Sequence, residues 1–158
     1  MEENCIFEYK SNGTWIFPIY EVKVLETSEG GMISCYEDLY GKPSSKFKIE
    51  IDLEKIETIK RVMLAHPEIF KYKEVEISTT LDGISNRFVF APKKDLTVEL
   101  RTDNIGTVKM PHMEQYFLED ADHPGSRYPC KAVEVVKVFD EIADVLRSAG
   151  VEEKYLRI

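Results

Sequence analysis

Residues 109–131 (KMPHMEQYFLEDADHPGSRYPCK) hold a dense group of side chains that can bind metal ions or transfer protons. The group contains two histidines, one cysteine and four carboxylates, namely His112, His123, Cys130, Glu114, Glu119, Asp120 and Asp122. Imidazole nitrogen, thiolate sulfur and carboxylate oxygen are ligands that zinc accepts in proteins. One hypothesis is therefore a metal site formed by His112, His123 and Cys130, in a small-ligand-binding protein or an enzyme that uses residues 112–130.

Part of this segment resembles the metal motif of zinc-dependent nucleobase deaminases. His112-Met113-Glu114 fits the H-x-E half of that motif, and Pro129-Cys130 fits the start of its P-C-x-x-C half. The second cysteine should stand at position 133, where this chain has Val133. Because a ligand is missing, and because only 15 residues separate Glu114 from Cys130, the sequence does not predict a deaminase.

The same segment can also be interpreted as an acidic surface loop. Residues 118–129 (LEDADHPGSRYP) contain the proline and glycine that are typical of connections between elements. The two histidines and the cysteine lack the close spacing that makes zinc motifs specific. Connections of this length are usually functional in compact domains. We therefore predict that Glu119, Asp120 and Asp122 contact a partner, and we expect no cofactor.

Length and composition limit the classes of protein that fit this chain. A chain of 158 residues with a hydrophobic fraction of 43% is predicted to form a single domain, residues 1–158. The net charge of −8 disfavours binding to nucleic acid, which requires clustered lysine and arginine. The longest apolar run, WIFPI, has about five residues and is too short to cross a membrane. The first residues do not resemble a signal peptide, so a cytoplasmic location is expected.

The three cysteines, Cys5, Cys35 and Cys130, are an odd number at wide spacings, which suits a reducing compartment better than a disulfide framework. The chain has no glycine-rich phosphate loop, no G-x-S-x-G and no C-x-x-C motif. A nucleophilic pair of Cys35 or Cys130 with a histidine stays open as an alternative.

Two β-hairpins are predicted from turn dipeptides flanked by apolar strands. Asp82-Gly83 is expected to join two strands within residues 73–90, with Ile77 opposite Phe88. A third strand over residues 95–102 is expected to extend this hairpin into an antiparallel meander. Asn12-Gly13 is expected to join the strands of the first hairpin.

The first hairpin has apolar residues on both faces. The expected pairing puts Phe7 and Tyr9 on the face that carries Ile16, Tyr20, Val22 and Val24. The opposite face would then carry four large apolar residues, Ile6, Trp15, Phe17 and Ile19. This face is predicted to bind a partner or to mediate self-association; the alternatives are a sheet buried on both sides or a register displaced by one residue. Pro18 indicates an edge or a bulge.

Two amphipathic helices are predicted, over residues 52–65 with Asp52 as N-cap and over residues 131–149 with Gly150 just after the end. Their apolar stripes are expected to face the core. The fold class is therefore α+β, an antiparallel β-sheet built from hairpins and meanders with both helices packed on one face.

The leading functional hypothesis is a small acidic protein, not an enzyme, that binds another macromolecule. A specific version is a neutralising partner similar to an immunity protein, which binds a basic toxin domain through carboxylates around an aromatic patch. A protein partner is expected, and a homodimer is compatible with the sequence.

Overall fold

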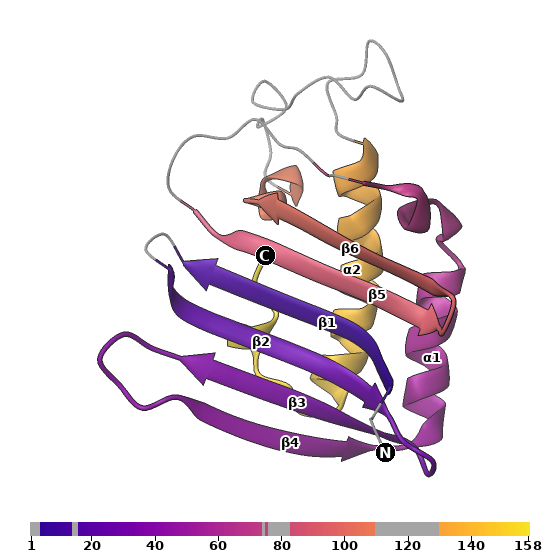
Figure 1. Cartoon of the computed structure of the whole chain (residues 1–158), viewed down its shortest axis with the longest axis horizontal. Helices are drawn as coiled ribbons and strands as arrows, with labels where there is room; N and C mark the ends of the chain where they lie inside the picture. Colours follow the sequence, from indigo (N-terminus) through magenta and orange to yellow (C-terminus); the bar gives the residue numbers. More distant parts are fainter. Residues whose placement is uncertain (1–3, 14–15, 74, 76–82, 110–129) are drawn as a thin grey trace.

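The computed structural model describes residues 4–13, 16–73, 75, 83–109 and 130–158, and it contains a six-stranded antiparallel sheet. The strands lie in the order β4-β3-β2-β1-β5-β6 (Figure 1). Their bounds are β1 Asn4–Gly13, β2 Ile16–Glu26, β3 Gly31–Asp38, β4 Ser45–Ile51, β5 Ser85–Lys93 and β6 Leu96–Asp103.

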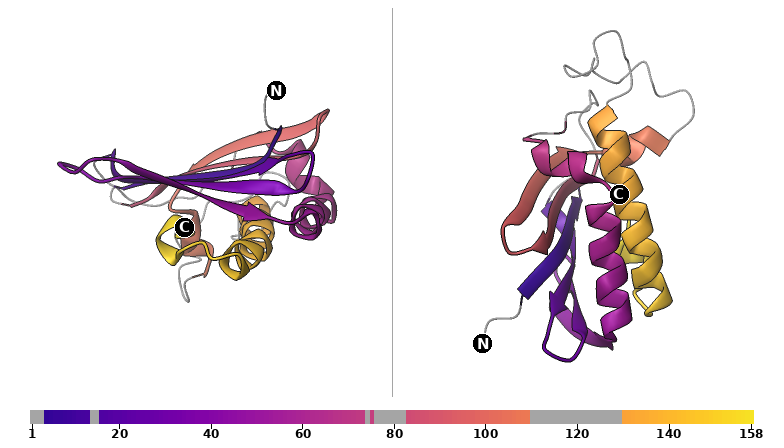
Figure 2. Two further views of the ribbon diagram at one scale, coloured as in Figure 1. Left: turned by 90° about the horizontal axis from the view of Figure 1, so that it is seen from below. Right: turned by 90° about the vertical axis from the view of Figure 1, so that its right-hand side faces the viewer.

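Both α-helices lie on one face of this sheet (Figure 2). They are α1 (Leu53–Leu64) and α2 (Cys130–Ser148), with short 3-10 helices η1 (Pro67–Lys71), η2 (Ile105–Lys109) and η4 (Glu153–Tyr155). The arrangement confirms the predicted α+β fold class.

The helix ends follow from local chemistry. The side chain of Asp52 accepts a hydrogen bond from Lys55 N at 3.0 Å, which satisfies a free amide of the first turn of α1. Gly150, with φ of +105°, ends α2, and the next amide, of Val151, donates to Leu146 O at 3.0 Å. Val151 and Leu146 are both buried, so the turn also closes an apolar contact.

The core lies between the sheet and the helices and is centred on aromatic rings. Phe139 of α2 packs against Tyr9 of β1, with ring centroids 4.6 Å apart, and against Phe88 of β5, at 5.5 Å. Phe7 and Phe90 extend this cluster, and all five rings are at most 1% exposed. Burial of these rings is a large part of what holds α2 on the sheet.

The first hairpin forms between the predicted strands but in a different register. Tyr9 stands opposite Val22 rather than Ile16, and the ladder is irregular between Asn12 and Gly13, opposite Pro18. From Phe7 to Asn12 the displacement is six residues, an even number, so the side chains of this stretch keep their predicted faces. Tyr9 and Val22 therefore share the core face as expected.

Ile6 is an exception, and its predicted place on the opposite face is wrong. The ladder between β1 and β2 is irregular between Cys5 and Phe7, so Ile6 is an extra residue in β1. A bulge of this kind lets two consecutive side chains turn the same way. Ile6 and Phe7 are both fully buried.

The predicted pairing of Phe88 with Ile77 is also wrong. Phe88 stands opposite Tyr9 of β1 on one side and Leu100 of β6 on the other, so both edges of β5 are occupied there. Ile77 itself lies outside the described residues. The core packing of the β1 rings against β5 outweighs the local turn preference of Asp82-Gly83. The third predicted strand is confirmed as β6.

Candidate binding surface on the open sheet face

The sheet face opposite the helices is covered by no element that the structure describes (Figure 2). Side chains alternate between the two faces of a strand, so the positions between core residues point outward here. Many of the outward positions on β1, β2, β5 and β6 carry charges: Glu8, Lys10, Glu21, Lys23, Arg87, Glu99 and Arg101. This surface is called the open face below.

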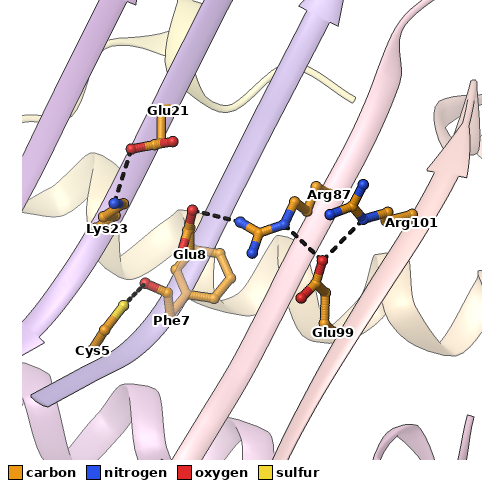
Figure 3. Close-up of polar contacts among 8 residues, drawn as sticks. All are labelled: Cys5, Phe7, Glu8, Glu21, Lys23, Arg87, Glu99 and Arg101. Carbon is orange, nitrogen blue, oxygen red and sulfur yellow. Dashed lines mark hydrogen bonds and ion pairs between the residues drawn. The ribbon is translucent and has the colours of Figure 1, made fainter.

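Ion pairs connect three strands of the open face (Figure 3). Arg87 Nη1 lies 2.6 Å from a carboxylate oxygen of Glu8, and Arg87 Nε donates to Glu99 Oε1 at 2.9 Å. Arg101 Nε donates to the same Glu99 oxygen, also at 2.9 Å. The hydrogen bonds from Arg87 and Arg101 lower the pKa of Glu99, so its carboxylate stays charged well into the acidic range.

Three cations lie in a row across β1, β5 and β6. Lys10 stands opposite Arg87, and Arg87 stands opposite Arg101. Like charges directly opposite each other destabilise a sheet, and Glu8 and Glu99 offset part of this cost. Lys10 forms no ion pair with any residue of the described part of the chain, so its ammonium is available to a ligand. Lys10, Arg87 and Arg101 are called the cation row.

The cation row borders an open hollow of about 550 Å³, also lined by Asn12 and by Ser85. Ser85 Oγ donates to Asp103 Oδ1 at 2.8 Å. No histidine or cysteine lines the hollow, so Ser85 lacks the imidazole base of a serine–histidine nucleophile there. Two carboxylates, of Glu21 and Asp103, line the hollow beside the three cations. Because Lys10 has no ion pair with a described residue, its ammonium is the donor best placed to bind an anionic group there.

An exposed aromatic pair lies at the same end of the sheet as the hollow. Tyr40, in the loop after β3, is 84% exposed and meets the ring of Phe17 edge-on, with centroids 5.8 Å apart. Ile19, which is half-buried, stands between Asn12 at the hollow and Asp38 at the end of β3. Of the residues predicted to bind a partner, Ile19 is therefore next to a residue that lines the hollow, and Phe17 contacts Tyr40.

Of the other predicted site residues, the structure describes two. Ile6 is in the core, and Cys130 is the first residue of α2. The remaining ones lie outside the described residues, namely Trp15, His112, Glu119, Asp120, Asp122 and His123. Within residues 4–13, 16–73, 83–109 and 130–158, no group of three histidine, cysteine or acidic side chains could hold a metal ion. The metal-site and acidic-loop hypotheses stay predictions.

Cys35 has no histidine partner among the described residues, where the sequence left a nucleophilic pair open. It is fully buried on β3, and burial, with a contribution from the charge of Glu152, raises the pKa of its thiol to about 11. The thiol is therefore protonated at neutral pH and a poor nucleophile. His66, the histidine in the described part of the chain, bonds instead to Glu134 and Glu141 of α2.

Comparison of the sequence with models of known protein families gives no match, and comparison with curated proteins gives none either. Among the described residues, neither α-helix is long and apolar enough to cross a membrane. The geometry of the open face is therefore the basis for assigning a function.

Proposed function

We propose that this protein acts by binding a partner protein through the open face. The Phe17–Tyr40 pair is the apolar anchor of this surface, and the cation row is its charged contact. The observation that carries the proposal is the exposure of Tyr40, which is 84% accessible although it packs on a neighbouring ring. A large aromatic side chain in this position gains considerable buried area when a partner covers it.

The composition of the surface agrees with what is known of protein interfaces. Aromatic and arginine side chains supply most of the binding energy at such interfaces, and a polar rim surrounds them. Phe17, near the start of β2, and Tyr40, just after β3, contact each other, and Arg87 and Arg101 line the hollow. A partner that matches this pattern presents an apolar group to the ring pair and a carboxylate or another anion to the cation row.

Binding rather than catalysis is supported by the chemistry of the hollow. Its residues supply donors for an anion, but they include no imidazole or thiol that could transfer a proton or attack a substrate near neutral pH. The proposal retains the non-enzymatic, protein-binding role expected from the sequence. It assigns that role to Tyr40 and the cation row, which the sequence did not indicate.

Site-specific photo-crosslinking tests the proposal directly. A photoreactive amino acid is placed at Tyr40 in cells that naturally produce the protein, and a matched control carries it at Leu53 of α1, which is 53% exposed on the helical side. We expect a discrete protein adduct from position 40 and none from position 53. Similar adducts from both positions, or none from position 40, would contradict the proposal.

A charge-reversal variant tests the role of the cation row in the same experiment. In Lys10→Glu/Arg101→Glu both changes affect side chains that line the hollow, and neither affects the Phe17–Tyr40 contact. The adduct from position 40 should be strongly reduced in this variant because an anionic group on the partner would then be repelled. An undiminished adduct would limit the interface to the aromatic pair and exclude the cation row.

A further inference from the structure

The outer edge of β4 is unpaired within the described residues. β4 bonds to β3 along its whole length, from Ser45 opposite Glu37 to Ile51 opposite Gly31. It forms the lower border of the sheet in Figure 1, and no described element lies beyond it. Such an edge presents a row of free amide and carbonyl groups, which is a template for another strand.

The side chains of β4 alternate between charged and apolar. Lys46, Lys48 and Glu50 are exposed and point away from the helices, whereas Phe47, Ile49 and Ile51 are half-buried against the core. The ring of Phe47 meets Tyr155 edge-on at 5.6 Å, which holds one end of the apolar row in place. A strand that pairs with this edge must carry the same alternation.

The alternation of charged and apolar side chains makes β4 complementary to a second copy of itself. We propose that it pairs antiparallel with β4 of a second copy of this chain, in the register that puts Ile49 opposite Ile49 of the other copy. Lys48 then stands opposite Glu50 of the second copy, and Phe47 stands opposite Ile51. The Lys48–Glu50 pair occurs twice, once from each copy, and both pairs are attractive. The apolar rows of the two copies join into one.

The neighbouring registers are less favourable. A displacement by one residue would put the apolar row of one copy opposite the charged row of the other. A displacement by two residues in one direction would put Lys48 opposite Lys48 of the second copy. The same displacement in the other direction would put Glu50 opposite Glu50 of the second copy. Like charges directly opposite each other are destabilising. The register centred on Ile49 keeps the faces matched and has no like-charge pair along Ser45–Ile51.

The proposed dimer goes beyond the binding role of the open face and does not depend on it. Residues directly opposite each other in a ladder point to the same face, so the open faces of the two copies would lie on one side of a continuous sheet. The dimer would therefore present two cation rows to a partner. A contact through one strand lies at the small end of specific interfaces, which bury about 1,200–2,000 Å², so we expect the dimer to dissociate on dilution.

Charge reversal with rescue tests this register. Sedimentation velocity over a concentration series should show a monomer–dimer equilibrium for the wild type. Lys48→Glu and Glu50→Lys each create two repulsive pairs and should raise the dissociation constant about tenfold. The double variant Lys48→Glu/Glu50→Lys restores opposite charges and should dimerise like the wild type. Both side chains are exposed, and circular dichroism checks that the variants stay folded.

A cysteine placed on the symmetry axis gives a second test. Opposed residues of an antiparallel pair have Cα atoms about 4.5–5.5 Å apart, which a disulfide can span. Ile49→Cys should give a covalent dimer on mild oxidation, whereas Ser45→Cys should not, because two copies of position 45 would be separated by about eight residues of strand. A wild type that is monomeric at all concentrations, a failed rescue, or equal crosslinking at positions 45 and 49 would each overturn the proposal.

Discussion

Arg87 stands directly opposite Arg101 between β5 and β6, and one carboxylate oxygen of Glu99 accepts a hydrogen bond from the Nε atom of each. The register of β5 and β6 makes the two guanidinium groups neighbours, and the shared carboxylate of Glu99 offsets their repulsion. This relationship explains how the cation row persists on a surface where repulsion would otherwise separate its members.

Replacing this shared acceptor should destabilise the fold slightly and in a salt-dependent way. We expect Glu99→Gln to lower the free energy of unfolding by at most about 1 kcal/mol, because the Glu99 side chain is 42% exposed and solvent screens its pairs. Urea unfolding at low and high salt measures the effect, which should shrink at high salt. Glu29→Gln, an exposed change in the loop between β2 and β3, is the control and should have little effect.

The same variant has a predicted pH dependence. The pKa of Glu99 is lowered in the folded protein by its hydrogen bonds from Arg87 and Arg101. Its contribution to stability is therefore fully present above the ordinary carboxyl pKa of 4.5 and is lost as the pH falls through the lowered value. The stability difference between the wild type and Glu99→Gln should disappear in strong acid, and a constant difference would refute this account.

The hydroxyl of Tyr9 joins the N-terminal strand to the last residues of the chain. It donates to the carbonyl oxygen of Arg157 and accepts from Asn86 Nδ2 at 2.8 Å. Tyr9→Phe leaves both groups without this partner in a buried site, and we expect a loss of about 1–3 kcal/mol in the free energy of unfolding. Tyr36→Phe, which removes a partly exposed bond to Asp38, is the matched control and should cost less than about 0.5 kcal/mol.

His66 connects the end of α1 to α2 and should make stability depend on pH near neutrality. Partial burial alone would lower the pKa of His66, but hydrogen bonds to Glu134 and Glu141, with the charges of both, raise it above its ordinary value of 6.5. The contribution of the charged imidazole is then fully present below pH 6.5 and is lost as the pH rises through the raised pKa. Melting temperatures from pH 5.5 to 9 should fall more steeply for the wild type than for His66→Gln. Parallel curves would exclude this role of the histidine.

Gly31, at the start of β3, is required by the close approach of α1. A Cβ atom at this position would overlap Cδ1 of Ile56 and lie 2.9 Å from Leu25 O. We expect Gly31→Ala to cost about 1–3 kcal/mol of stability, measured by urea unfolding. Ile56→Val removes Cδ1, the nearest of the overlapping atoms, and keeps Cγ1 at 2.7 Å, so it relieves part of the clash. Ile56→Val should therefore cost less stability in the Gly31→Ala background than in the wild type. Simple additivity of the two changes would contradict the proposed clash.

Local patterns were sufficient to predict some elements of this fold. Asp52 and Gly150 indicate the helix ends because capping depends on a few neighbouring residues. The core-face positions of Phe7, Tyr9, Val22 and Val24 were also predicted correctly, although Ile6 was not and Tyr9 pairs six residues away from the expected position. An even displacement conserves the face of every side chain, so the alternation is more reliable than the turn.

Long-range pairings could not be predicted in this way. Phe88 has Tyr9 as a neighbour because β1 lies beside β5, and no local pattern indicates a contact between strands so distant in sequence. The cation row depends on the same pairing, since Lys10 meets Arg87 only there. The sequence shows that charged residues alternate along β5 and β6. It does not show which residues of the neighbouring strands stand opposite these charges.

The position of β1 inside the sheet has a consequence for synthesis of the chain. β1 is flanked by β2, which follows at once, and by β5, which begins at Ser85. While a ribosome makes the intervening residues, β1 keeps one edge unpaired, and the part of the apolar face that α2 covers stays open until α2 emerges after all six strands. The nascent protein is therefore most vulnerable to aggregation during this interval, when a chaperone would have the most surface to protect.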